Sequence, residues 1–232
     1  MSGSYAQARL NRVTSPKPRK TLRGPDRPIA IRSEYITAER AALILKPQGD
    51  AQSAAAYRIE DEEGQVQFTA SGRKFSGRSC REFRDASGLP LFELHRKISL
   101  RNAWCITLPG SKITNMATGS PRLSFGAAAF GNFNISFRNA AAVESKREED
   151  KEVTLEIERH GHVLESFDVV DGDRKVAEVR ESIQHNKKLA LMASSRRNYR
   201  PVLDVIVTPG VDVSLIAAIA VIASDSVFGS DD

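Results

Sequence analysis

Residues 211–223 read Val211-Asp-Val-Ser-Leu-Ile-Ala-Ala-Ile-Ala-Val-Ile-Ala223, and this stretch decides the fold. From Val213 onward only Ser214 is polar, so a helix made of these residues is apolar on every face and lies either in a protein core or in a membrane. Asp212 is placed to cap the first turn of the helix. The eleven residues 213–223 fall well short of the ~20 that span a bilayer. We therefore expect a buried helix over 212–228.

Most of the chain before this helix has the pattern of short β-strands. Alternating apolar and polar residues are separated by glycine-containing turns such as Glu62-Glu63-Gly64 and Asp171-Gly172-Asp173. Turns at intervals of roughly 8–12 residues are typical of an antiparallel sandwich or barrel. The predicted strands cover 57–60, 66–70, 80–84, 91–98, 103–108, 133–137, 153–158, 163–170, 175–179 and 202–207. The polar clusters 111–121 and 145–152 are predicted loops.

The diameter of a helix selects among the possible β architectures. Strands ~4.8 Å apart and tilted by ~35° close at a radius of roughly 7–8 Å for eight strands and about 11 Å for twelve. A helix with its side chains is ~10–12 Å across, so its axis needs a wall roughly 10 Å away. Eight strands are too few to enclose it. The sequence therefore predicts a mainly β fold, a closed antiparallel barrel of about twelve strands around a central hydrophobic C-terminal helix.

The order of these patterns resembles the LURP-one-related family. The resemblance rests on Tyr57-Arg-Ile-Glu-Asp-Glu-Glu-Gly64, Arg84-Asp-Ala-Ser-Gly-Leu-Pro-Leu-Phe92, Arg96-Lys-Ile-Ser-Leu100 with Trp104, Val176-Ala-Glu-Val179 and Pro209-Gly-Val-Asp-Val213. It covers roughly residues 33–228. It implies a tubby C-terminal-like fold, an architecture attributed also to phospholipid scramblases, and it implies no catalytic motif.

The formal charge of +5 is concentrated at the N-terminus. Residues 1–33 hold eight basic residues and one acidic residue, a charge of +7, which leaves −2 for the other 199 residues. The first 28 residues contain four prolines and no periodic apolar pattern, which is typical of disorder. We expect a disordered basic tail over 1–32, the barrel domain over 33–228 and an acidic end over 229–232.

Residues that would carry catalysis or bind a cofactor are missing from the sequence patterns. His160 and His162 have no Cys/His/Asp cluster to complete a metal site, and they are predicted in a solvated hairpin turn. Cys80 and Cys105 fall in predicted strands, where thiols usually serve as small buried apolar groups. We expect a non-enzymatic protein with no catalytic residue, no metal ligand and no cofactor.

Basic clusters supply the candidate binding residues, because arginine and lysine side chains suit phosphate. An anion site on the outer wall of the barrel is predicted from Arg96, Lys97, Lys187, Lys188, Arg196, Arg197 and Arg200. In the tail, Lys17, Arg19, Lys20 and Arg23 would each add roughly 1 kcal/mol next to an anionic membrane. The same tail residues also suit a nuclear localisation signal, and an ordinary charged surface is the alternative for both sets.

These observations predict a binding module for anionic phospholipid headgroups of the phosphoinositide kind, or a membrane tether. The alternatives are a protein-interaction or transcription-linked scaffold with a nuclear-type tail, and scramblase-like lipid transport by insertion of the helix. The candidate partners are an anionic membrane surface and other proteins, and we expect no nucleic acid on the barrel. With two cysteines and no apolar run behind Met1, the chain is predicted to be intracellular rather than secreted. The candidate locations are the cytoplasm, the inner membrane face and the nucleus.

Overall fold

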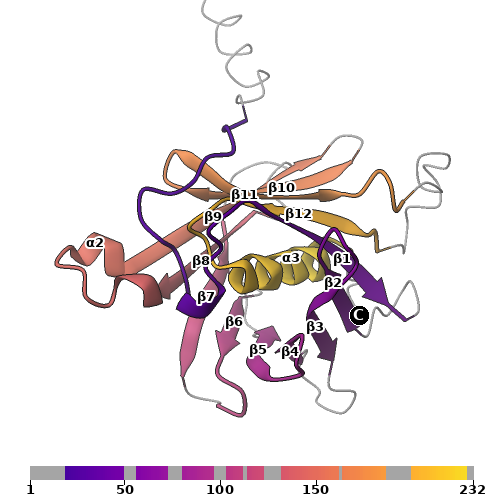
Figure 1. Ribbon diagram of the computed structural model, residues 1–232, viewed down its shortest axis with the longest axis horizontal. Coiled ribbons are helices and arrows are strands. Elements are labelled where there is room, and N and C mark those ends of the chain that lie inside the picture. The colour runs from indigo at the N-terminus through magenta and orange to yellow at the C-terminus, as the bar shows by residue number, and fades with distance from the viewer. Residues whose placement is uncertain are drawn as a thin grey trace, which may run out of the picture.

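The computed structural model describes residues 19–49, 56–72, 80–96, 103–111, 114–122, 132–161, 164–186 and 200–228. Within them, twelve strands form a closed barrel around one long helix (Figure 1). The strands are β1 (Ala41–Gln48), β2 (Ala56–Glu60), β3 (Val66–Gly72), β4 (Cys80–Asp85), β5 (Pro90–Arg96), β6 (Trp104–Thr107), β7 (Asn115–Pro121), β8 (Phe133–Arg138), β9 (Glu152–Gly161), β10 (Glu165–Asp171), β11 (Arg174–Glu181) and β12 (Leu203–Val207). Each pairs antiparallel with its chain neighbours, and β12 pairs with β1 to close the ring. The predicted mainly β barrel is confirmed.

Helix α3 (Val213–Phe228) fills the barrel (Figure 1). Every residue from Leu215 to Ala223 is 0% exposed. Strands surround the helix on every side, so none of its faces contacts water. This explains why the helix is apolar all round. Inward side chains of the wall share its core, and the rings of Phe83 and Phe92 stack with centroids 5.0 Å apart. In the part of the chain that is described, no helix is both long enough and apolar enough to cross a membrane.

Asp212 caps the first turn of α3, as predicted. Its Oδ1 accepts hydrogen bonds from the backbone N–H groups of Ser214 and Leu215, at 2.8 and 3.1 Å. Its Oδ2 accepts from the backbone N–H groups of Ile31 and Arg32, at 3.1 and 2.9 Å. Burial raises the pKa of the Asp212 carboxyl, and these hydrogen bonds oppose that shift. The cap thus joins the N-terminal segment to the helix.

Asp225 holds the other end of α3. Arg81 of β4 grips both carboxylate oxygens, with N–O distances of 2.6 and 2.9 Å. Tyr57 of β2 donates its hydroxyl to Asp225 at 2.7 Å, and the guanidinium of Arg200 donates to the same oxygen. Burial raises the pKa of the Tyr57 phenol, and the charge of Asp225 raises it further, so the phenol keeps its proton and donates. The helix is therefore held by a carboxylate near each end, with Asp212 bound to the N-terminal segment and Asp225 bound to the wall.

Residues 19–32 pack against the barrel, whereas the sequence predicts a disordered tail over 1–32. Ile29 and Ala30 are 0% exposed, and Ile29 bridges to Val211. Basic side chains reach carboxylates of the wall, with N–O distances of 2.9 Å from Arg27 to Asp171 and 2.6 Å from Arg19 to Asp168. The packed domain therefore includes residues 19–32 in front of the predicted start at 33. The rest of the predicted tail, 1–18, lies outside the described residues.

Deleting this packed segment is expected to cost stability, whereas deleting the residues before it is not. A chain that starts at Ser33 loses the burial of Ile29 and Ile31 and leaves Asp212 Oδ2 without its two donors. We expect a loss of roughly 3 kcal/mol or more in the free energy of unfolding. A chain that starts at Arg19 is the matched control and keeps the stability of the full chain. Urea denaturation measures both, and equal midpoints for all three chains would contradict the packing.

Strand β7 occupies residues that the sequence analysis assigns to a loop, and that assignment is wrong. Asn, Gly, Ser and Pro in Asn115–Pro121 are typical turn residues. A Cβ at Gly119 would lie 3.3 Å from the Cβ of Trp104 on β6, so glycine lets the two strands approach. Strand β1 was also not predicted, and the second expected loop contains the short helix α2 (Glu148–Lys151). Each of the ten predicted strands overlaps an observed one.

Candidate functional site

A groove of about 820 Å³ crosses the outer wall of the barrel over β1, β12 and β11. The strand register explains its lining, since directly opposed residues project from the same face of a sheet. Ile44 of β1 lies opposite Asp204 of β12, and Asp204 lies opposite Arg180 of β11. The next residue of β12, Val205, is 0% exposed in the core, which places this row on the outer face.

One rim of this outer-wall groove is a bend after β11 that exposes an isoleucine. Ile183 is 74% exposed. Beside it, Ser182 Oγ lies 2.9 Å from Nδ1 of His185. The Asn186 carboxamide donates to the carbonyl oxygens of Ser182 and Val202 and accepts from the N–H of Val202. The bend is thus held by hydrogen bonds on both sides while it presents an apolar side chain to solvent.

The charges in the outer-wall groove are mixed. Arg40, Arg180 and His185 line it together with Glu62 and Asp204. The Arg180 side chain is 52% exposed, and its Nε lies 3.8 Å from Asp204 Oδ2. An exposed pair of this kind is worth ~0–1 kcal/mol. The Arg180 guanidinium can therefore exchange this partner for a phosphate at little cost.

Most of the predicted anion-site residues lie outside the described residues. These are Lys97, Lys187, Lys188, Arg196, Arg197 and the side chain of Arg96, whose backbone ends β5. Arg200 is described, and it does not lie on the outer wall. It is 8% exposed and its guanidinium donates to Tyr57 and Asp225. The prediction that Arg200 lies on the outer wall is therefore wrong. Its guanidinium pairs instead with the mostly buried carboxylate of Asp225, near the end of α3.

The described tail cations bind the barrel itself. Arg19 lies near Asp168 and also 3.4 Å from Glu178. Lys20 donates to the carbonyl oxygen of Gly172 at 3.0 Å and lies 3.8 Å from Glu158. The positive charges of Arg19 and Lys20, which we expected to face an anionic membrane, are thus paired with acidic groups of the barrel.

Two further tail residues and two histidines complete the predicted set. Arg23 is exposed, while its backbone N–H donates to the carbonyl oxygen of Lys175, and Lys17 lies outside the described residues. His160 belongs to β9 rather than to a turn, and its Nε2 lies 3.2 Å from Asp168 Oδ2. His162 is outside the described residues.

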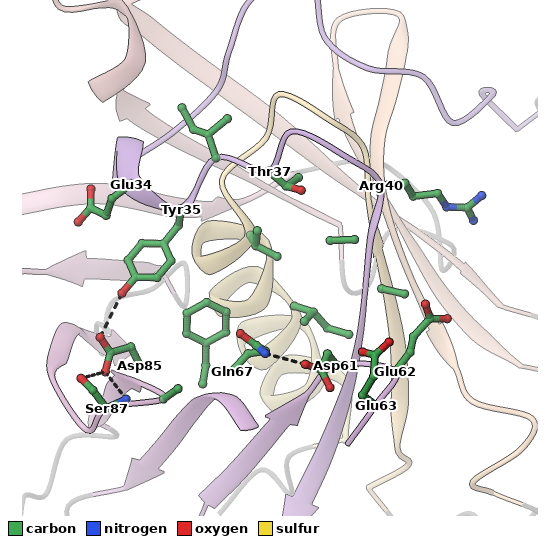
Figure 2. A pocket seen from close by; sticks show the side chains of 17 residues that line it. Glu34, Tyr35, Thr37, Arg40, Asp61, Glu62, Glu63, Gln67, Asp85 and Ser87 are labelled. Carbon is green, nitrogen blue, oxygen red and sulfur yellow. Dashed lines mark hydrogen bonds between the residues drawn. The ribbon is translucent and has the colours of Figure 1, made fainter. Parts of the chain in front are cut away.

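A second cleft, of about 650 Å³, lies where α3 begins, between the 3-10 turn η1 (Ser33–Tyr35) and the β2–β3 and β4–β5 turns (Figure 2). Five of its lining residues carry carboxylates against the single guanidinium of Arg40: Glu34, Asp61, Glu62, Glu63 and Asp85. Figure 2 shows Tyr35 pointing to Asp85, with the hydroxyl donating at 3.2 Å. Hydrogen bonds from Ser87, above all, lower the pKa of Asp85, so that carboxylate is charged. This acidic cleft repels an anionic headgroup.

Comparison with known proteins adds a family and a fold. A family model described as LURP-one-related matches residues 41–224. An X-ray structure of a protein from Arabidopsis thaliana superposes with a TM-score of 0.51 at 17% sequence identity, and the match covers 84% of this chain and 96% of that one. At this identity the likeness concerns the fold alone. No curated protein matches this chain.

Proposed function

The chain belongs to the LURP-one-related family, and on that premise we propose that it is a non-enzymatic binding module for anionic phospholipid headgroups. One observation carries the proposal. The outer-wall groove has an isoleucine, Ile183, 74% exposed on its rim beside cationic Arg40 and Arg180. An exposed apolar side chain next to arginines suits shallow insertion between lipid headgroups with phosphates in reach.

The sequence that leaves this rim supports the same proposal. Between the buried residues Asn186 and Arg200 the chain reads Lys187-Lys188, then Leu189-Ala-Leu-Met192, then Arg196-Arg197. Two basic pairs thus flank an apolar run, and the segment contains no acidic residue. Apolar contact combined with cations is how peripheral proteins hold anionic bilayers, at roughly 1 kcal/mol for each basic residue near the surface.

The other surfaces described above also favour binding through the outer-wall groove. The acidic cleft at the start of α3 shares Arg40 and Glu62 with the outer-wall groove, so a headgroup is expected on the side of the groove that Ile183 and Arg180 line. Arg19 and Lys20 are paired with the barrel, so they contribute little net charge. Transport by insertion of α3 would require residues that are 0% exposed to leave the core. Peripheral binding through the outer-wall groove needs no such rearrangement.

Vesicle flotation of the full chain tests the proposal. Reversing two charges with Lys187→Glu and Lys188→Glu is expected to weaken binding to phosphoinositide-containing vesicles more than about tenfold. The matched control reverses a basic pair elsewhere in the chain, Lys146→Glu and Arg147→Glu, which is exposed and lies just before α2. The control variant is expected to float like the unaltered protein.

Two outcomes would contradict the proposal. The first is equal recovery of the unaltered protein on neutral and on anionic vesicles, which would remove headgroup charge from recognition. The second is an equal loss for both charge-reversed pairs, which would reduce binding to net charge without a site.

A further inference from the structure

Three side chains of metal-ligating type meet on the outer face of β4 and β5, away from both clefts. They are Cys80, Glu93 and His95. Cys80 begins β4 and lies directly opposite His95 of β5. Glu93 stands two residues before His95 on the same strand and so projects from the same face. The strand pairing alone therefore brings a thiol, an imidazole and a carboxylate together.

The distances within this Cys80–Glu93–His95 cluster fit a single small cation. One ligand atom from each residue lies within 4.8 Å of the other two. His95 Nε2 lies 3.2 Å from Glu93 Oε2. Tetrahedral zinc with N and O bonds of ~2.0–2.1 Å requires an N–O edge of about 3.3–3.4 Å. These two atoms thus stand close to the separation that zinc imposes.

The surroundings orient the cluster. The N–H of Gly110 donates to Glu93 Oε1 at 3.2 Å, which leaves Oε2 on the side of His95. Hydrogen bonds of this kind to a ligating carboxylate are typical of metal sites. Cys80 and Glu93 are 8% and 5% exposed, whereas the His95 side chain is 26% exposed. The cluster is therefore mostly shielded and still open to a cation from the imidazole side.

We propose that Cys80, Glu93 and His95 form a zinc site with three protein ligands and one open position. A soft thiolate with an imidazole and one carboxylate suits Zn²⁺, whereas Ca²⁺ and Mg²⁺ take all-oxygen sets. Bound zinc joins β4 to β5 through side chains. The site is separate from the outer-wall groove and does not depend on lipid binding.

Cys105 offers a matched control. It lies directly opposite His95 on the other side, in β6, and it is as buried as Cys80. It does not belong to the cluster of ligand atoms that lie within 4.8 Å of one another. Cys80→Ser and Cys105→Ser thus make the same chemical change on either side of one histidine.

Cobalt and zinc titrations of the EDTA-treated full chain test the site. The unaltered protein and Cys105→Ser are expected to bind one equivalent, with thiolate-to-cobalt charge-transfer absorption. Cys80→Ser is expected to lose that absorption. Both Cys80→Ser and His95→Ala are expected to weaken zinc binding by a factor of about 100 or greater. Melting in EDTA separates a lost site from a lost fold, since the variants should melt like the metal-free protein, while added zinc should raise the melting temperature only where the site is intact.

Three results would overturn the proposal. One is a stoichiometry near zero for the unaltered protein. Another is unchanged zinc affinity in Cys80→Ser. The third is charge-transfer absorption that disappears in Cys105→Ser, which would contradict the assignment of the ligands.

Discussion

Replacing Ile219 by aspartate is expected to unfold the protein at room temperature. Ile219 is 0% exposed at the middle of α3, inside the ring of strands. The variant loses about 2–3 kcal/mol of apolar burial and adds the several kcal/mol that an unpaired buried carboxylate costs. Together these approach the ~5–15 kcal/mol that stabilises a typical domain. Circular dichroism and urea denaturation measure the change.

A surface isoleucine supplies the control for this experiment. Ile183→Asp makes the same chemical change at a side chain that is 74% exposed, and it should leave the free energy of unfolding unchanged within about 0.5 kcal/mol. If Ile219→Asp also melts like the unaltered protein, α3 does not occupy the core of the barrel.

The second large loss of stability is expected when the carboxylate of Asp225, near the C-terminal end of α3, is removed. Asp225→Ala takes from Arg81 and Arg200 the carboxylate that they share in a mostly buried place. Breaking a buried ion pair on one side typically costs about 3–5 kcal/mol. The Tyr57 hydroxyl loses its charged acceptor as well and keeps only the Ser224 hydroxyl, at 3.1 Å. Urea denaturation should therefore show a large fall in the midpoint.

Asp204→Asn separates this loss from the general effect of removing an acidic residue. Asp204 faces Arg180 at 3.8 Å on the outer wall, where such pairs contribute ~0–1 kcal/mol. We expect its unfolding free energy to stay within that range of the unaltered protein. Equal destabilisation by Asp225→Ala and Asp204→Asn would contradict the view that Asp225 anchors the helix.

The sequence sufficed for the helix and for the architecture around it. A run that is apolar on all faces and too short to span a membrane has one place in a β protein, the interior, and the diameter of a helix then sets the number of strands. Asp212 followed from cap chemistry alone. These inferences hold because they depend on local sequence and on chain geometry rather than on which residues meet in space.

The elements that were missed depend on tertiary contacts. Strand β7 reads as a turn because Gly119 is selected by the proximity of Trp104 and not by a preference for turns. The segment before Ser33 reads as a charged tail because the carboxylates that accept hydrogen bonds from Arg19 and Arg27 lie more than 140 residues further along the chain. A count of charges cannot reveal pairing over such separations.

The candidate sites divide in the same way. The basic pairs around 187–197 are visible in the sequence, but the outer-wall groove arises from the pairing of β1, β12 and β11. Arg200 was placed on the outer wall because nothing in the sequence links it to Asp225. The zinc cluster depends on the register of Cys80 against His95, beyond an irregularity in the β4–β5 pairing at Phe83 and Arg84. The sequence therefore indicates which residues could bind a ligand, but it does not show which residues lie next to one another in the fold.

Vesicle flotation of the full chain beside a chain that begins at Arg19 tests the central claim most directly. The shorter chain keeps the packed segment and the outer-wall groove and lacks residues 1–18. If the barrel itself recognises headgroups, both chains will float with phosphoinositide-containing vesicles and neither will float with neutral ones. Loss of flotation on removal of residues 1–18, in a chain that still melts like the full protein, would contradict recognition by the barrel.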